Sequence, residues 1–202
     1  LDSTIYDLLV ASRPDIRTVI HETTVEGLDI VPANIDLSAA EVQLVNEVAR
    51  EQALKRVLRP VLDEYDVILV DCQPSLGLLT INALTASHGV IIPLETEFFA
   101  LRGVALLVET VERVKDRLNA TLEIDGILAT MVDSRTLHSR EVLERLEQAF
   151  GEQLFDTRIR RTIKFPDASV ANEPITSYAP SHPGADAYRR LAREVIARGD
   201  VA

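Results

Sequence analysis

Apolar strand-like runs alternate with amphipathic helical patterns over most of this 202-residue chain, and this order constrains the fold more than any other feature. The apolar runs are DVILVD (66–71), GVIIPL (89–94) and IDGILATMV (124–132), and helical patterns occupy 77–86 and 101–118 between them. Strands that are apolar throughout and separated by helices are typical of a parallel sheet with right-handed crossovers. We therefore expect an α/β fold, a mostly parallel sheet flanked by helices on both faces.

The same alternation extends toward both ends of the chain. A short strand is expected at 28–32, followed by one amphipathic helix over 38–58, where Ser38 and Glu41 have the spacing of a capping box. Two more helical patterns cover 140–150 and 185–197. Because no repeat or low-complexity linker separates these segments, we expect residues 1–202 to form a single domain.

Composition limits the classes of function. The chain has 21 basic and 32 acidic residues and a net charge of −11, so any attraction to nucleic acid needs a local basic patch. No apolar run approaches the length of a membrane span, and the start LDSTIYDLLV has no basic leader. The single cysteine, Cys72, fits a reducing compartment. We expect a cytoplasmic protein without membrane contact.

Asp71 ends the apolar run DVILVD. Ligands of open parallel sheets bind beyond the carboxyl ends of the strands, and an acid there holds magnesium beside nucleotide phosphates in Walker-B strands. A carboxylate that only caps the next helix or meets a surface arginine is the other interpretation. A phosphate-binding loop is absent from these residues, since each glycine stands alone and no lysine follows one.

The segment DCQPSLGLLTINALTA (71–86) resembles the signature of the ParA/Soj chromosome-partitioning ATPases, a deviant-Walker family that also contains MinD. Four further segments resemble the same family in the same order: 25–44, 90–107, MVDSRT (131–136) and HPGADAYRRLAREV (182–195). The resemblance implies a P-loop NTPase-like sheet. Because family members begin with a P-loop and a second strand, we expect the N-terminal strands to be missing and the chain to be the retained part of a longer protein. Gln73 departs from the proline usual in the family.

The resemblance also implies cofactors, partners and a location. ATP and magnesium would be bound in the intact protein, with Asp71 as the catalytic, magnesium-side acid acting through a water. An ATP-bound homodimer would bind DNA non-specifically, and a ParB-like protein would stimulate hydrolysis during chromosome or plasmid partitioning. The protein would be nucleoid-associated. Without the P-loop nothing neutralises triphosphate charge, so the chain alone is expected to be inactive.

The segment TRIRRTIKF (157–165) carries four basic residues and no acid. Basic side chains neutralise backbone phosphates and give sequence-independent, salt-sensitive DNA binding. A solvated edge whose arginines pair with nearby acids is the alternative. The resemblance implies that Arg135, Arg161 and Lys164 contact DNA.

The family resemblance also implies four residues beside the nucleotide base. FPDASVANEPI (165–175) resembles the loop that lies against the base, which places Pro166 and Asp167 at the contact positions, with Met131 and Asp133 at the neighbouring strand end. Met131 has a second interpretation as a core methionine.

Three other functions remain open. Ser75 in QPSLG resembles half of a nucleophile elbow, but no histidine or acid is tied to it. A MinD-like positioning ATPase would need a membrane-seeking helix, and LAREVIARGDVA (191–202) lacks bulky anchors. A relative without a P-loop that only binds DNA or a partner is the third. One cysteine disfavours a nitrogenase-iron-protein relative.

Overall fold

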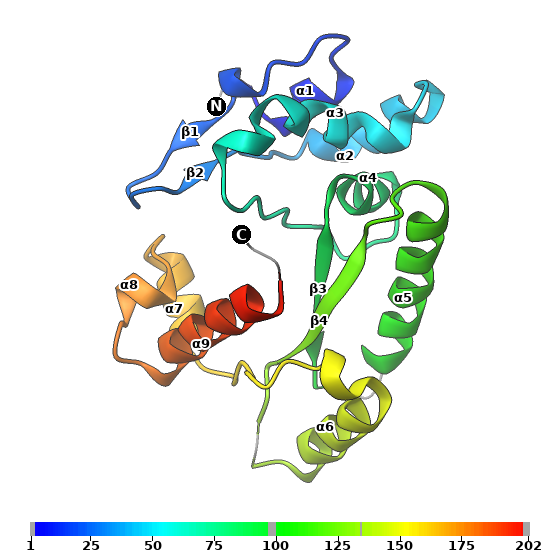
Figure 1. Ribbon diagram of the computed structural model, residues 1–202. Helices are drawn as coiled ribbons and strands as arrows, with labels where there is room; N and C mark the ends of the chain where they lie inside the picture. The colour runs from blue at the N-terminus through cyan, green and yellow to red at the C-terminus, as the bar shows by residue number, and fades with distance from the viewer. Residues whose placement is uncertain (1–2, 97–99, 134, 200–202) are drawn as a thin grey trace. The chain divides into compact units, whose positions relative to one another are not determined.

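The computed structural model describes residues 3–96, 100–133 and 135–199, and its fold is α/β (Figure 1). Short 3-10 turns join several of the elements. The helices and strands are, in order, α1 Ile5–Val10, β1 His21–Glu22, β2 Asp29–Ile30, α2 Leu37–Gln43, α3 Ala53–Leu58, α4 Leu78–Ala86, β3 Gly89–Glu95, α5 Ala100–Arg117, β4 Glu123–Thr130, α6 Leu137–Phe150, α7 Lys164–Val170, α8 Ile175–Tyr178 and α9 Pro183–Arg198.

The chain divides into two compact units. Unit 1 consists of Leu1–His88 and Glu112–Leu122, and unit 2 of Gly89–Val111 and Glu123–Ala202. The single domain expected for 1–202 stays a prediction.

Unit 2 contains the parallel pair that the alternating pattern predicts. β3 and β4 pair in parallel, with Ile92 opposite Ile127, and α5 follows β3 and precedes β4 in the chain (Figure 1). The register shifts by one residue between Val90 and Ile91. The two apolar runs therefore form strands because each has a partner that completes its backbone hydrogen bonds.

Helices cover both faces of this pair, as expected. Side chains alternate along each strand, so Ile92 and Ile127 point to one face and Leu128 to the other. The first face packs with buried residues of α5 and α6, and the second with Phe155 and with α9 (Figure 1). Burial of these apolar side chains is what holds unit 2 together.

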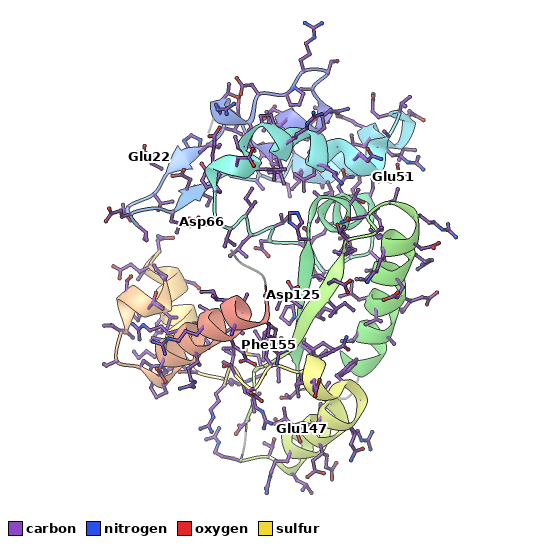
Figure 2. All side chains as sticks on the ribbon, viewed as in Figure 1. Glu22, Glu51, Asp66, Asp125, Glu147 and Phe155 are labelled. Carbon is purple, nitrogen blue, oxygen red and sulfur yellow. The ribbon has the colours of Figure 1, made fainter. Side chains whose placement is uncertain are left out.

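The chain after α6 continues the parallel pairing beside β4. Phe155 donates its N–H to the Ile127 carbonyl at 2.9 Å, and Ile159 donates to the Ala129 carbonyl at 2.9 Å. Phe155, labelled in Figure 2, lies in this segment. It is 1% exposed, and a Cβ on Gly126 would lie 2.6 Å from its ring. Glycine at position 126 therefore allows this segment to approach β4 closely.

Unit 1 is mainly helical. Its core joins α1, α2, α3 and α4 through buried apolar residues such as Leu8, Ala40, Val57 and Ala83. The strand expected at 28–32 is present as the two-residue β2, but it pairs antiparallel with β1.

The strand expected at 66–71 is wrong. Residues 67–73 have no secondary structure, and Val67 and Leu69 are 55% and 86% exposed. A strand exists only through a ladder with a neighbour, and among the residues that the structure describes none pairs with this segment. An apolar run indicates that a segment can be buried in a sheet, but it does not show that a partner strand is present.

The single helix expected over 38–58 is also wrong. α2 ends at Gln43, Ala49 adopts a left-handed φ of 55°, and α3 begins at Ala53. The buried amide of Asn82 on α4 lies at this break: its Oδ1 accepts from Leu54 N–H at 3.1 Å and its Nδ2 donates to the Arg50 carbonyl at 2.9 Å. Tertiary hydrogen bonds thus replace the helical bonds that the periodicity predicts.

Candidate functional site

The carboxyl end of β4, in unit 2, holds the turn that contains three of the predicted site residues. Met131 has a left-handed φ of 52°, which ends the extended backbone directly after Thr130. Met131 is 39% exposed, so it is not the core methionine of the alternative interpretation. Surface exposure leaves it available to a ligand.

Asp133 and Arg135 form a bidentate ion pair in this turn. Arg135 Nε donates to Asp133 Oδ1 at 2.9 Å and Nη2 donates to Oδ2 at 2.8 Å, while the Arg135 N–H donates to Oδ1 at 3.1 Å. Arg135 is 88% exposed at its side chain and Asp133 26%. These bonds, chiefly those from the Arg135 side chain, lower the pKa of Asp133 to about 2.

A buried serine fixes the start of this turn. Ser139 at the beginning of α6 is 3% exposed, accepts a hydrogen bond from the Asp133 N–H at 3.3 Å and bonds the Thr96 hydroxyl at 2.9 Å. Thr96 follows β3, so both strand ends are linked to α6. Ser139 therefore holds the backbone at the start of the Asp133 turn and ties it to the end of β3.

The basic segment lies beside the same turn. Val132 donates its backbone N–H to the Ile159 carbonyl at 3.1 Å, and Arg161 donates its backbone N–H to the Val132 carbonyl at 3.2 Å. The charge of Arg161 also lowers the pKa of Asp133. The structure thus brings Arg135 and Arg161, distant in sequence, to one edge of unit 2.

Lys164 begins α7 and is held within it. Its Nζ contacts Asp167 Oδ2 at 3.1 Å and lies 5.8 Å from the centroid of the Tyr178 ring. The Asp167 carboxylate raises the pKa of Lys164. Pro166, between them in sequence, is exposed.

The interpretation of these cations as an ion-paired edge is accurate for part of the set. Arg135 and Lys164 pair with acids, and Arg158 pairs with Glu147 on α6. For Arg161 no ion pair is found within the described ranges. Each paired cation is at least 40% exposed at its side chain, so a phosphate can still approach it.

Asp71 belongs to unit 1, in the irregular segment that precedes α4. It is exposed, and in the described part of the chain its carboxylate has no hydrogen-bond or ion-pair partner. The helix-capping and arginine-pairing interpretations of Asp71 are therefore not realised in unit 1. Glu41 takes the capping position instead: its Oε1 accepts from the Leu79 N–H at 3.3 Å, at the start of α4.

Glu41 therefore does not form the capping box expected with Ser38. α2 begins after Asp36, and the Ser38 hydroxyl donates to the Ile35 carbonyl at 2.8 Å. The spacing predicted that Glu41 caps its own helix, whereas Glu41 caps α4. The sequence does not show this, because α2 and α4 come into contact only in the folded unit.

Ser75 has hydrogen-bond partners that do not activate a nucleophile. Its Oγ accepts from Gln73 Nε2 at 2.8 Å and from the Gly77 N–H at 3.4 Å. Neither partner is a base, so unit 1 offers no support for the hydrolase interpretation.

The chain's own residues fit part of a nucleotide site. Magnesium in such sites takes one or two protein carboxylates and completes its shell with phosphates and water, and a single exposed acid such as Asp71 fits that need. Within 3–96, 100–133 and 135–199, no group of three acidic, histidine or cysteine side chains gathers for a metal. The phosphate cradle is absent from residues 1–202.

No helix among the described residues is long and apolar enough to cross a membrane.

Sequence reasoning missed three residues around these sites: Glu41, Ser139 and Tyr178. None stands in a chemical motif, and each acts through a partner 14 to 43 residues away. For Glu41 the sequence holds one indication, the capping-box spacing from Ser38, but this spacing predicted a cap on the helix that contains Glu41 and not on α4.

Comparison with known proteins identifies relatives of this chain. The profile of a family described as AAA domain matches residues 1–124. An uncharacterized protein of Mycobacterium tuberculosis is 60% identical over 198 residues, covering 98% of this chain and 62% of that protein. The chromosome-partitioning ATPase Soj of Treponema pallidum is 48% identical over 195 residues, covering 96% of this chain and 77% of Soj. The chain thus spans less than two thirds of the mycobacterial relative.

Solved structures show the same fold. A structure described as cobyrinic acid a,c-diamide synthase from Mycobacterium smegmatis, with a bound ATP analog and magnesium, superposes with a TM-score of 0.80 at 36% identity, covering 96% of this chain and 71% of that one. The cell-division ATPase MinD of Pyrococcus furiosus superposes with a TM-score of 0.78 at 20% identity, covering 98% and 77%, and shares the fold.

Proposed function

Because the chain belongs to the ParA/Soj family of chromosome-partitioning ATPases, we propose that it serves as the greater part of an ATP-dependent partition protein that binds DNA without sequence preference. The observation that carries this proposal is the 48% identity to a Soj ATPase over 96% of the chain. The bound ATP analog and magnesium in the mycobacterial structure support the same cofactors here.

Asp71 is the proposed magnesium-side acid. Its carboxylate is exposed and unpaired within the described residues, so it is available to a hydrated cation. When bound, magnesium would neutralise phosphate charge. The phosphate cradle would have to come from outside residues 1–202, and hydrolysis by these residues alone is not expected.

The proposed nucleotide-base contacts are Met131, Asp133, Pro166 and Asp167. Met131 and Pro166 supply exposed apolar surface, and the two aspartates supply hydrogen-bond acceptors. All four lie in unit 2, in the turn after β4 and in α7.

Arg135, Arg161 and Lys164 are the proposed DNA contacts. A double replacement, Arg135→Glu with Lys164→Glu, should weaken binding of the full-length gene product to DNA of any sequence in the presence of ATP. Log affinity falls as log salt rises, and each lost phosphate contact makes this dependence shallower by about 0.9. The slope for the double variant should therefore be shallower than that of the parent by about two. Fluorescence anisotropy of a labelled duplex at several salt concentrations measures this slope.

Arg190→Glu is the matched control, because Arg190 on α9 is also exposed and ion-paired, with Asp186. It reverses the charge at one site, as each replacement in the double variant does, and should leave the slope close to that of the parent. An unchanged slope in the double variant would remove Arg135 and Lys164 from the DNA contacts.

The test also separates the MinD-like alternative, which shares the fold. A partition protein should bind the duplex and not vesicles of anionic lipid, and a positioning ATPase should do the reverse. Stimulation by a ParB-like partner and dimer formation with ATP belong to the same proposal.

A further inference from the structure

Glu41 gathers the segment around Asp71 in unit 1. One oxygen, Oε1, accepts from Gln73 Nε2 at 3.1 Å and from the Leu79 N–H at 3.3 Å. The first contact lies two residues after Asp71 and the second at the start of α4. A single carboxylate on α2 thus joins the segment to the helix that follows it.

The segment between these two contacts is also closed on itself. Ser75 donates its N–H to the Gln73 carbonyl at 2.8 Å, and the Thr80 hydroxyl donates to the Ser75 carbonyl at 2.7 Å. Apart from Glu41, the side-chain bonds found from Gln73 to Thr80 run within that segment or to the backbone of α4. Glu41 is therefore the side chain whose hydrogen bonds connect this turn to α2.

Gly77 is what lets the Glu41 carboxylate approach so closely. A Cβ at position 77 would lie 2.2 Å from Oε1 of Glu41, well inside contact distance. The φ of Gly77 is −75°, which any residue adopts, so an alanine there strains no backbone. The relief of the clash would come from the flexible end of Glu41, which would have to move away.

We infer that Glu41 is a positioning residue that holds the 71–77 segment, and with it the Asp71 carboxylate, in the geometry needed for magnesium. This inference rests on the proposed function of Asp71. Partners that orient a metal ligand typically change metal affinity or activity by about 10- to 100-fold when they are lost. Glu41 would act through Gln73 and the start of α4, without touching the ion.

The test measures the magnesium concentration that half-saturates ATP hydrolysis by the full-length gene product, in the parent, Glu41→Ala, Gly77→Ala and the double variant. Glu41→Ala should raise it about tenfold or more. Gly77→Ala should have a similar effect, because it displaces the same carboxylate, and the double variant should be no worse than either single one. Glu41→Gln keeps an acceptor oxygen and should restore most of the affinity. Glu47→Ala, which removes an exposed acid in the same region, should match the parent.

Labelling of Cys72 gives a readout that does not depend on hydrolysis. Cys72 is the one cysteine of this chain, is exposed and adjoins Asp71, so its rate of reaction with a maleimide, located by peptide mass, reports the order of the segment. Glu41→Ala and Gly77→Ala should speed labelling several-fold, and Glu47→Ala should not.

Unchanged labelling and an unchanged magnesium requirement in Glu41→Ala would overturn the inference, as would additive effects of the two substitutions. If the parent hydrolyses no ATP with magnesium, the proposed function fails. The labelling rates then still decide whether Glu41 orders the segment.

Discussion

The pair of Asp133 with Arg135 is the clearest case in which one residue changes the chemistry of another. Arg135 stabilises the ionised carboxylate through two side-chain bonds and one backbone bond, which lowers the pKa of Asp133 to about 2. A depressed carboxyl pKa stabilises the fold above the unfolded-state pKa, and this contribution is lost as pH falls through the folded-state value.

Arg135→Gln should therefore raise the pKa of Asp133 toward its ordinary value of 3.8. The difference in unfolding free energy between parent and variant should be constant from neutral pH to about pH 4 and shrink as pH falls to about 2. Carboxyl NMR titration measures the pKa directly. Arg190→Gln should leave the Asp133 titration as in the parent, and an unshifted Asp133 in Arg135→Gln would contradict the pairing.

Single residues could be assigned from the sequence only where a motif or a family resemblance named them. Arg135 and Asp133 were both named, but for different ligands, and nothing in their spacing showed that they pair with each other. Ser139 and Glu41 could not be found, because their roles come from contacts across elements. Side-chain hydrogen bonds of this kind depend on packing that sequence spacing does not encode.

At the scale of elements, the break between α2 and α3 depends on Asn82. Its side chain is 1% exposed and bonds Leu54 N–H, the Arg50 carbonyl and the Leu78 carbonyl. Asn82→Ala should destabilise the protein by about 1–3 kcal/mol, since it leaves buried backbone groups without partners. Urea unfolding measures this, with the exposed Asn46→Ala as the control; equal stability of parent and Asn82→Ala would refute the role.

Two glycines give opposite predictions. Gly126→Ala places a methyl group 2.6 Å from the buried Phe155 ring and should cost about 1–3 kcal/mol through overpacking. Gly103 lies within α5 with nothing within 4 Å of an added Cβ, so Gly103→Ala should stabilise the helix by about 0.5–1 kcal/mol. Thermal unfolding of both variants measures these opposite changes in stability. A stabilised Gly126→Ala would show that the segment around Phe155 does not pack tightly against β4.

Elements could be predicted where local periodicity and tertiary partners agree. The run at 89–94 lies within β3 and the run at 124–132 forms β4 as far as Thr130, and the helices α5, α6 and α9 match their patterns. The helix over 38–58 failed because Asn82 stabilises a break, and α7 and α8 were missed because four- and seven-residue helices have too few turns to show a period.

At the scale of the whole molecule, the α/β class and the family follow from the sequence, while the run at 66–71 shows the limit. Its valine and leucine residues indicate a strand covered on both sides, yet Leu69 is 86% exposed in unit 1. Pairing is a property of two segments, so an apolar run without a partner among the described residues stays irregular. The acid that ends this run, Asp71, is the residue on which the proposed activity depends.

The most direct measurement is the affinity of the full-length gene product for ATP, by isothermal titration calorimetry, with magnesium and with EDTA. The parent should bind ATP more tightly with magnesium, and Asp71→Ala should lose that gain, by about tenfold or more. Asp66→Ala, an exposed acid five residues earlier (Figure 2), should bind as the parent does. An Asp71→Ala variant that keeps the full magnesium-dependent affinity would contradict the assignment of Asp71.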